Sequence, residues 1–307
     1  MKILITGSTG MVGRNISEHA GIKKYDLLLP SRAELDLFNF EAVKNYIAKN
    51  KPDFIVHCAG KVGGIQANIN EPVQHCIQNI ELGRNVIMAA REFGVRKFIN
   101  LGSSCMYPKG IDEELTENKI LTGELESTNE GYALAKIVTQ RLCSYISKES
   151  PEYQYKTLIP CNLYGRYDSF DPTRSHLIPA VIQKIHDAKK RNINSVEIWG
   201  DGNARREFMY AEDLADCVFE CVTRFNEMPP VMNCGLGVDH TINEYYEATA
   251  KVLEFEGSFS HDLSKPVGMK RKLVSVKLVN AFGWKARRSL EEGLRLTYEY
   301  YLSYKEA

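Results

Sequence analysis

Three side chains have the types and the spacing that proton exchange with a bound ligand requires. Tyr132 and Lys136 stand four residues apart in a helical pattern, so both lie on one face of a helix. An unperturbed tyrosine has a pKa of about 10, and a neighbouring ammonium lowers such a pKa by favouring the phenolate. Ser103 follows an apolar run that stops at Gly102. A hydroxyl just beyond a strand lies at the edge of the sheet where ligands bind and where acids and bases are useful.

A glycine-rich turn at the start of the chain predicts the element that binds a dinucleotide. An apolar strand over residues 2–6 leads into Gly7-x-x-Gly10-x-x-Gly13 and then into a helix. Glycines permit a tight turn and close approach of the backbone to a pyrophosphate. The free N–H groups at the start of the helix favour the anion.

The end of the second strand predicts which dinucleotide binds. Strand residues 26–30 are followed by Ser31 and Arg32, where NAD-binding folds usually carry an acid for the ribose hydroxyls. A guanidinium instead suits a 2′-phosphate, which it binds through two parallel hydrogen bonds. We therefore expect NADP(H) as the cofactor.

Strand and helix patterns alternate along the first half of the chain. This order indicates an α/β fold of the Rossmann type, a doubly wound parallel sheet with a smaller C-terminal α/β substrate-binding domain. We expect the NADP-binding domain over residues 1–165, with 208–232 returning to it, and the substrate-binding domain over 166–307, which the resemblance described below implies to bind a nucleotide sugar. His57 stands within an apolar strand, so we interpret it as a core histidine rather than a catalyst.

The composition argues against several classes of function. Lys and Arg together number 39, as do Asp and Glu, so the 307-residue chain has no net charge that would attract nucleic acid. No apolar run reaches the roughly 20 residues of a membrane span. The eight cysteines are scattered without metal-ligand spacing. We therefore predict no metal site and a reducing, cytoplasmic compartment.

Joined together, these motifs resemble the extended short-chain dehydrogenase/reductases and, more narrowly, the GDP-L-fucose synthase family. The narrower resemblance spans nearly the whole chain and rests on short segments. They are Thr9–Gly13, Lys61–Ile65, Leu101–Cys105, Ser175–Ala180, Trp199-Gly200 and Arg206–Phe208. The resemblance implies a GDP-linked 4-keto-6-deoxy sugar as substrate and a homodimer that pairs the helix of Tyr132 with its counterpart.

The resemblance also implies a role for each catalytic candidate. Tyr132 would protonate the C4 oxygen as NADPH delivers hydride to C4, with Ser103 bonded to the carbonyl. Lys136 would lower the tyrosine pKa and hold the nicotinamide ribose. Cys105 and His176 would form the acid/base pair that epimerises C3 and C5, whose protons the C4 ketone acidifies. Ser103 and Cys105 alternate along the chain, so an extended backbone directs both to one side.

The remaining candidates bind the cofactor or the nucleotide sugar. For the cofactor they are Gly7, Thr9, Gly10, Met11, Val12, Gly13, Arg32, Asp36, Leu37, Ala59, Gly60, Lys136 and His176. For the substrate they are Asn162, Trp199, Arg206 and Lys272. The resemblance matches Arg206 with a diphosphate-binding arginine and aligns Lys272 with a lysine for the substrate phosphate.

Three departures from the family pattern leave the identity of the sugar open. Gly131 replaces the usual proline before the catalytic tyrosine, residues 171–174 differ from the usual ones, and Ser275 stands where an acid is common. One alternative is a C4 reductase alone, acting on a related GDP-4-keto-6-deoxy hexose or heptose after a separate epimerase. The other is a non-catalytic NADP-binding regulator, which would need neither Tyr132 nor Lys136.

Overall fold

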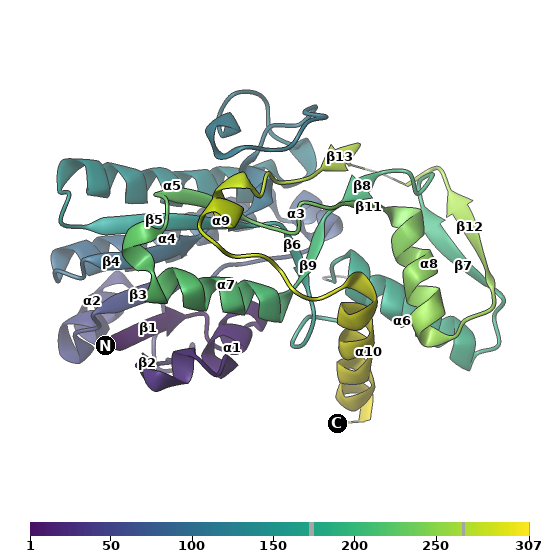
Figure 1. The fold of residues 1–307 in the computed structure, drawn as a ribbon, viewed down its shortest axis with the longest axis horizontal. Coiled ribbons are helices and arrows are strands. Elements are labelled where there is room, and N and C mark those ends of the chain that lie inside the picture. The colour runs from purple at the N-terminus through teal and green to yellow at the C-terminus, as the bar shows by residue number, and fades with distance from the viewer. Residues whose placement is uncertain (172–174, 266–267, 307) are drawn as a thin grey trace.

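A six-stranded parallel sheet forms the centre of one half of the protein (Figure 1). The structure is a computed structural model that describes residues 1–171, 175–265 and 268–306. The strand order is β10-β5-β4-β3-β1-β2, and every neighbouring pair runs parallel. These strands are β1 (Lys2–Thr6), β2 (Asp26–Leu28), β3 (Phe54–His57), β4 (Lys97–Leu101), β5 (Gln154–Pro160) and β10 (Val231–Cys234).

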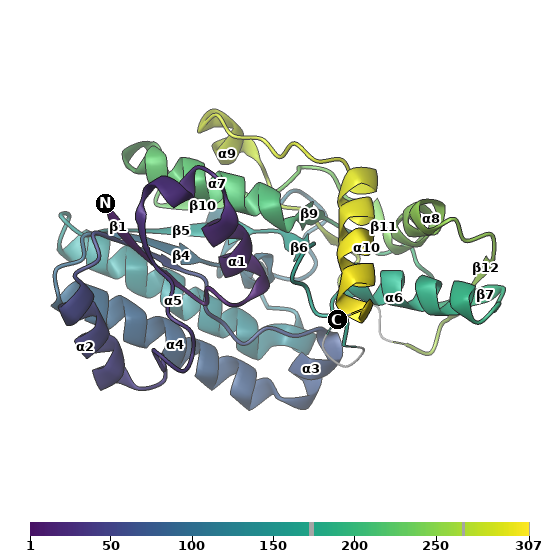
Figure 2. The same ribbon diagram turned by 90° about the horizontal axis from the view of Figure 1, so that it is seen from below.

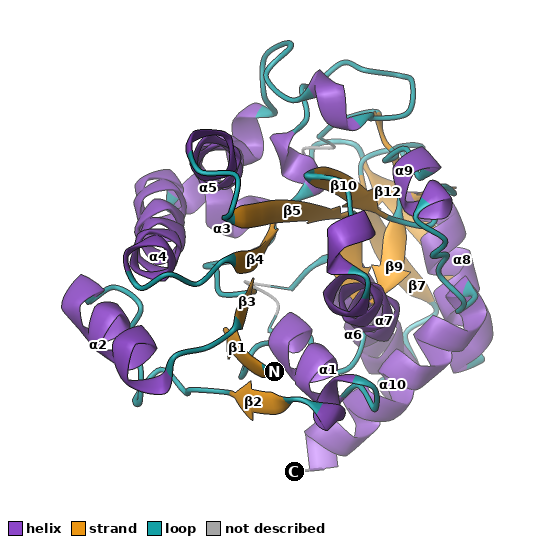
Figure 3. Ribbon diagram, turned by 60° about the vertical axis from the view of Figure 1, so that its left-hand side comes forward, coloured by secondary structure: helices purple, strands orange, loops and turns teal. Residues whose placement is uncertain are grey.

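Helices cover both faces of this sheet, which is why its central strands are apolar along nearly their whole length. On one face lie α2 (Phe40–Asn50), α4 (Pro72–Glu92) and α5 (Glu130–Glu149), and on the other α1 (Met11–Glu18) and α7 (Ala211–Thr223) (Figure 3). The expected Rossmann-type, doubly wound sheet is confirmed. His57 is 2% exposed and its Nδ1 lies 2.7 Å from Thr6 Oγ1, so its interpretation as a core histidine is confirmed as well.

The other half is smaller and combines helices with short sheets, as expected. Strand β7 (Ser195–Trp199) pairs in parallel with β12 (Ser258–Asp262). A three-stranded sheet has the order β11-β8-β13, and β6 pairs with β9. The other elements of the smaller half are β6 (Asn162–Tyr164), α6 (Leu177–Lys190), β8 (Arg205–Arg206), β9 (Phe208–Tyr210), β11 (His240–Thr241), α8 (Ile242–Leu253), β13 (Arg271–Lys272) and α10 (Leu290–Glu306). Two further helices, α3 (Ile65–Asn70) and α9 (Lys277–Ala281), contact α4 and β10 of the first half.

The chain returns from the smaller half to the parallel sheet twice. The first return supplies α7, which packs on α1, and the edge strand β10. The second return places α9 against β10, where Trp284 Nε1 donates to Asp216 Oδ2 of α7 at 2.8 Å. The expected boundaries include the first return but not the second. In the turned view, α10 stands at the border between the two halves (Figure 2). Within the described ranges, no helix has the length and apolar character needed to cross a bilayer.

Candidate active site

The glycine turn after β1 requires glycine at two positions. Gly7 has φ +70°, and a Cβ there would come 2.8 Å from the Ala59 backbone. A Cβ at Gly13 would lie 2.2 Å from the Gly7 carbonyl oxygen. The Gly10 N–H donates to that same oxygen at 3.0 Å, and α1 begins directly afterwards at Met11. The residues present therefore fit a pyrophosphate at the start of α1, as dinucleotide binding requires.

The loop after β2 lies next to this turn and carries the residues expected at the adenosine end of the cofactor. Ser8 Oγ donates to the Pro30 carbonyl at 3.1 Å, which ties the glycine turn to this loop. Arg32 and Asp36 are exposed, whereas Leu37 is buried. The Arg32 guanidinium is thus accessible to a phosphate from solvent.

Ser103, Tyr132 and Lys136 gather beyond the carboxyl end of β4. Ser103 follows this strand, and Tyr132 and Lys136 come from the first two turns of α5. Lys136 is 7% exposed, its Nζ donates to the Leu101 carbonyl at 2.9 Å, and this Nζ lies 5.8 Å from the centre of the Tyr132 ring. Burial lowers the pKa of Lys136 to about 8. A Cβ at Gly60 would lie 3.6 Å from Nζ, so the loop after β3 also reaches this centre.

The structure differs from the expectation that Lys136 lowers the pKa of Tyr132. Burial raises the pKa of Tyr132, the nearby Cys105 raises it further, and a hydrogen bond with Ser103 acts in the opposite direction. The physical reason is that burial is the largest influence on the phenol, while the Lys136 ammonium donates to the Leu101 carbonyl and lies 5.8 Å from the centre of the Tyr132 ring. Tyr132 is therefore a protonated phenol at neutral pH in this structure.

Two side-chain donors contact the sulfur of Cys105. Asn129 Nδ2 lies 3.3 Å from Sγ, and Lys272 Nζ lies 3.5 Å from the same atom. The Cys105 N–H donates to Ser103 Oγ at 3.2 Å, which links this cysteine to the reducing centre. Sequence reasoning assigned Lys272 to a substrate phosphate and did not single out Asn129. The available signal for Asn129 was its place three residues before Tyr132, at the N-cap of α5.

His176 occupies the N-cap position of α6 and is half-buried. Burial lowers the pKa of its imidazole, which keeps the ring neutral at pH 7. No interaction among the described residues joins His176 to Cys105. The unusual residues 172–174 that precede it in the sequence lie outside the described part of the chain.

Two of the substrate candidates have different surroundings. Asn162 is half-buried, and its Nδ2 donates to the Glu207 carbonyl at 2.9 Å, which ties β6 to β9. Trp199 is 47% exposed at the end of β7. The ammonium groups of Lys184 and Lys265 lie 5.4 and 5.6 Å from its ring centre. An exposed indole flanked by two cations suits a planar base that carries phosphates. Lys184 was missed because nothing in its local sequence marks it.

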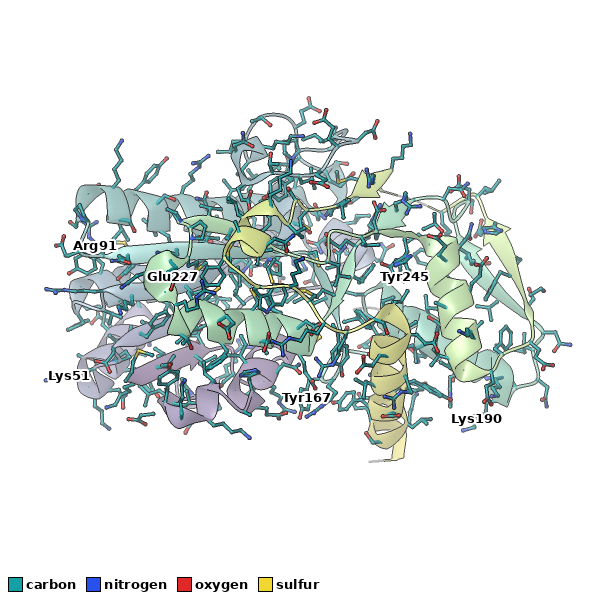
Figure 4. All side chains as sticks on the ribbon, in the orientation of Figure 1. Lys51, Arg91, Tyr167, Lys190, Glu227 and Tyr245 are labelled. Carbon is teal, nitrogen blue, oxygen red and sulfur yellow. The ribbon has the colours of Figure 1, made fainter. Side chains whose placement is uncertain are left out.

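Arg206 and Lys272 are neighbours on two parallel strands, β8 and β13. Tyr245 of α8 donates through its hydroxyl to the Arg206 carbonyl at 2.9 Å, which anchors β8 to the smaller half (Figure 4). Burial lowers the pKa of Arg206, while Glu126 and Cys105 raise it. Arg206 thus lies close enough to Cys105 to interact with its charge, so the diphosphate candidate and the epimerisation candidate share one site.

The structure explains one departure from the family pattern. A Cβ at Gly131 would come 2.8 Å from the Pro72 carbonyl oxygen and 3.3 Å from Cys76 Cβ, so the N-terminus of α4 occupies the space that a side chain would need. Ser275 is 1% exposed, and its Oγ has no hydrogen-bond partner among the described residues. Nothing in the structure explains a serine at that position.

Comparisons with known proteins identify the family of the chain. The chain matches the model of the NAD dependent epimerase/dehydratase family over residues 3–235. It is 55% identical to a GDP-L-colitose synthase of Yersinia pseudotuberculosis over 99% of both chains. It is 49% identical to a GDP-L-fucose synthase of Azorhizobium caulinodans, covering 98% of this chain and 96% of the other.

A solved structure shows the same agreement in three dimensions. A GDP-mannoheptose C4 reductase from Campylobacter jejuni with NADP bound superimposes with a TM-score of 0.88 at 29% identity, over 98% of each chain. A family match over more than half of the chain and close relatives along its full length lead to one conclusion. The chain belongs to the NAD dependent epimerase/dehydratase family of enzymes.

Proposed function

We propose that the chain reduces the C4 ketone of a GDP-linked 4-keto-6-deoxy sugar with NADPH, after epimerising C3 and C5. The observation that carries the proposal is the meeting of Ser103, Tyr132 and Lys136 beyond β4 with Cys105 beside them. The names of the relatives support a GDP-sugar substrate, and the NADP-bound structural neighbour supports the cofactor. A non-catalytic regulator would have no use for the buried lysine and tyrosine.

The chain's own groups account for the reduction step. When bound, NADPH supplies the hydride to C4. Ser103 holds the C4 carbonyl oxygen by a hydrogen bond, and Tyr132 donates its proton to that oxygen as the charge develops there. The raised pKa of Tyr132 suits this direction because the phenol keeps its proton until the oxygen becomes basic. Lys136 holds the ribose and supplies a positive charge next to the tyrosinate that is left.

Epimerisation needs one group that removes a proton and another that returns it on the opposite face of the ring. The C4 ketone acidifies the protons at C3 and C5, and the resulting enolate is stabilised by the same donors that hold the carbonyl. Cys105 and His176 are the pair that performs these two transfers. The pKa of His176 is lowered by burial, so the ring is available as a neutral base at pH 7.

The sugar is the point on which the colitose synthase and the fucose synthase differ by name. Colitose lacks the 3-hydroxyl that fucose carries, and the two sugars otherwise share the 6-deoxy-L-galactose skeleton. The identity with the colitose synthase makes a 4-keto-3,6-dideoxy sugar, on which only C5 needs epimerising, a second candidate substrate. Parallel assays with the 4-keto-6-deoxy and 4-keto-3,6-dideoxy forms of GDP-mannose distinguish these substrates by their kcat/KM values.

Further parts of the proposal concern assembly and location. Residues 1–165 with 208–232, together with the second return at α9, form the NADP-binding domain, and the rest of 166–307 forms the nucleotide-sugar-binding domain. Two chains pair through α4 and α5, which pack together and expose apolar side chains at helical spacing. These are Val73, Ile77, Leu134, Val138 and Tyr145. We place the enzyme in the cytoplasm, consistent with eight free cysteines among the described residues. Light scattering of the purified protein tests the dimer.

Product analysis with GDP-4-keto-6-deoxy-mannose tests the activity itself. With NADPH, we expect oxidation of one equivalent of cofactor and a product inverted at C3 and C5. Without NADPH in deuterated water, we expect deuterium at both carbons. Reduction without any deuterium incorporation would leave a C4 reductase that acts after a separate epimerase. Absence of NADPH oxidation with every 4-keto sugar offered would contradict the proposed reaction.

A further inference from the structure

We infer that Lys272 is a positioning residue for Cys105, holding the sulfur and its negative charge from the opposite half of the protein during proton transfer at the sugar. The inference rests on the proposed epimerase function and assigns Lys272 a role other than binding the substrate phosphate. Cys105 comes from the chain after β4, whereas Lys272 comes from β13, so the contact joins the two halves.

The contact is made by a lysine that has little access to water. Lys272 is 8% exposed, and its Nζ lies 3.5 Å from Cys105 Sγ, within the range of a hydrogen bond to sulfur. A buried ammonium is costly unless a polar or charged group accepts from it. The half-buried thiol supplies that acceptor, and it does so best as a thiolate.

The backbone of β13 is fixed, which keeps Nζ in place. Lys272 pairs with Arg206 on β8, and the preceding Arg271 donates through Nε to Asp239 Oδ2 at 2.5 Å. Two residues after Lys272, the Val274 N–H donates to Glu207 Oε2 at 3.0 Å. The strand that carries Lys272 is therefore anchored by hydrogen bonds before this residue, at Arg271, and after it, at Val274.

Other groups that face Cys105 come from two further elements, α5 and β8. Asn129, at the N-cap of α5, donates through Nδ2 to the sulfur at 3.3 Å from a second direction. Arg206 of β8 and Tyr132 of α5 both interact electrostatically with Cys105. The sulfur thus lies among two donors, a guanidinium and a phenol. Lys272 is the charged one of the two donors, so we expect its removal to affect the thiolate most.

The chemical step shows why the cysteine needs such a partner. The thiolate takes a proton from the carbon next to the C4 ketone, becomes a neutral thiol, and leaves the electron pair in the enolate. Lys272 keeps its own proton throughout, so atoms and charge balance without any added reactant. The ammonium, 3.5 Å from Sγ, orients the sulfur and stays hydrogen-bonded to it while the proton moves.

The test compares Lys272→Met and Lys272→Arg with Lys270→Met, a matched control at an exposed lysine two residues away. The first readout needs no substrate: alkylation of Cys105 by iodoacetamide at pH 7.5, followed by peptide mass spectrometry. We expect K272M to slow alkylation about tenfold, K272R to restore most of it, and K270M to match wild type. At pH 9.5, where an ordinary thiol is ionised, the K272M and wild-type rates should converge, which controls for access to the sulfur.

The second readout measures deuterium incorporation into the GDP-4-keto sugar without NADPH, and the third measures NADPH-dependent reduction of the already epimerised ketone. We expect K272M to slow incorporation about tenfold, and to slow it more than it slows reduction of the epimerised ketone. Unchanged alkylation in K272M would overturn the inference. An increased KM with unchanged incorporation would also overturn it and restore the phosphate role.

Two different measurements distinguish a failure of the proposed epimerase function from a failure of the role inferred for Lys272. If wild type incorporates no deuterium, the epimerase proposal fails. The alkylation comparison still decides whether Lys272 controls the state of Cys105, because that measurement involves neither sugar nor cofactor.

Discussion

Replacing Glu207 with glutamine tests the hydrogen bonds that hold the Arg206 strand in place. Glu207 is 1% exposed. Its Oε1 accepts from the N–H groups of Leu236 and Gly237 at 2.5 and 2.8 Å, and its Oε2 accepts from Val274 at 3.0 Å. A glutamine of the same shape must turn its NH2 group toward at least one of these donors. Because each buried donor left unpaired costs about 1–3 kcal/mol, we expect E207Q to lose about that much unfolding free energy.

The difference in unfolding free energy between wild type and E207Q should depend on pH, and this dependence tests how burial changes the pKa of Glu207. Burial raises the pKa of Glu207 from 4.5 to about 7, although its three backbone donors lower it. The folded state then keeps a proton that the unfolded chain releases. The stabilisation is therefore complete below pH 4.5 and is lost as the pH rises through about 7. The difference between these two pKa values corresponds to about 3 kcal/mol of unfolding free energy. Wild type should exceed E207Q in stability by more at pH 5 than at pH 8.

Urea unfolding followed by circular dichroism at the two pH values measures these differences. Glu152→Gln removes an exposed carboxylate and serves as control, with an expected change within about 0.5 kcal/mol. Equal stability of E207Q and wild type at both pH values would refute the hydrogen-bond reasoning. A gap that widens from pH 5 to pH 8 would show that the backbone donors outweigh burial.

Three further substitutions test the cofactor site and the reducing centre. Gly13→Ala places a Cβ 2.2 Å from the Gly7 carbonyl oxygen, so we expect NADPH affinity, measured by fluorescence titration, to fall at least about tenfold while the circular dichroism spectrum is kept. Tyr132→Phe removes the proton donor and should lower kcat of reduction by about 10²–10⁴, and full turnover of this variant would contradict the mechanism. Arg32→Ala should raise the KM for NADPH about tenfold and leave that for NADH unchanged, and an equal effect on both cofactors would argue against 2′-phosphate binding.

Local sequence patterns are enough to predict the elements that build the reducing centre. Ser103 follows an apolar run, and Tyr132 and Lys136 keep helical spacing. In a parallel sheet the carboxyl ends of strands meet at one edge, so the topology brings these residues together once the fold class is known. The same reasoning places His57 in the core, where it contacts Thr6. These predictions succeed because each depends on neighbours in the sequence and on one topological rule.

Side-chain contacts between the two halves of the protein could not be predicted from local sequence patterns. Lys272 lies 167 residues from Cys105 in sequence, and no periodicity indicates that their side chains meet. The buried carboxyl of Glu207 accepts hydrogen bonds from three N–H groups, which belong to two loops distant in the sequence. The lowering of the Tyr132 pKa by Lys136 was wrong for a similar reason. Spacing on a helix fixes which face a lysine occupies, but it does not show that the Lys136 ammonium donates to the Leu101 carbonyl.

The contact between Cys105 and Lys272 has a consequence for protein engineering. Ser103, Tyr132 and Lys136 all come from the first half of the chain, whereas Lys272 comes from the second. A chimera that joins this first half to the second half of a relative, with a crossover after α5, would keep the reducing groups and exchange the partner of the cysteine. A donor half without that lysine should yield a ketoreductase with impaired proton exchange. The two chemistries of the site are then separable by recombination, with Ser103, Tyr132 and Lys136 unchanged.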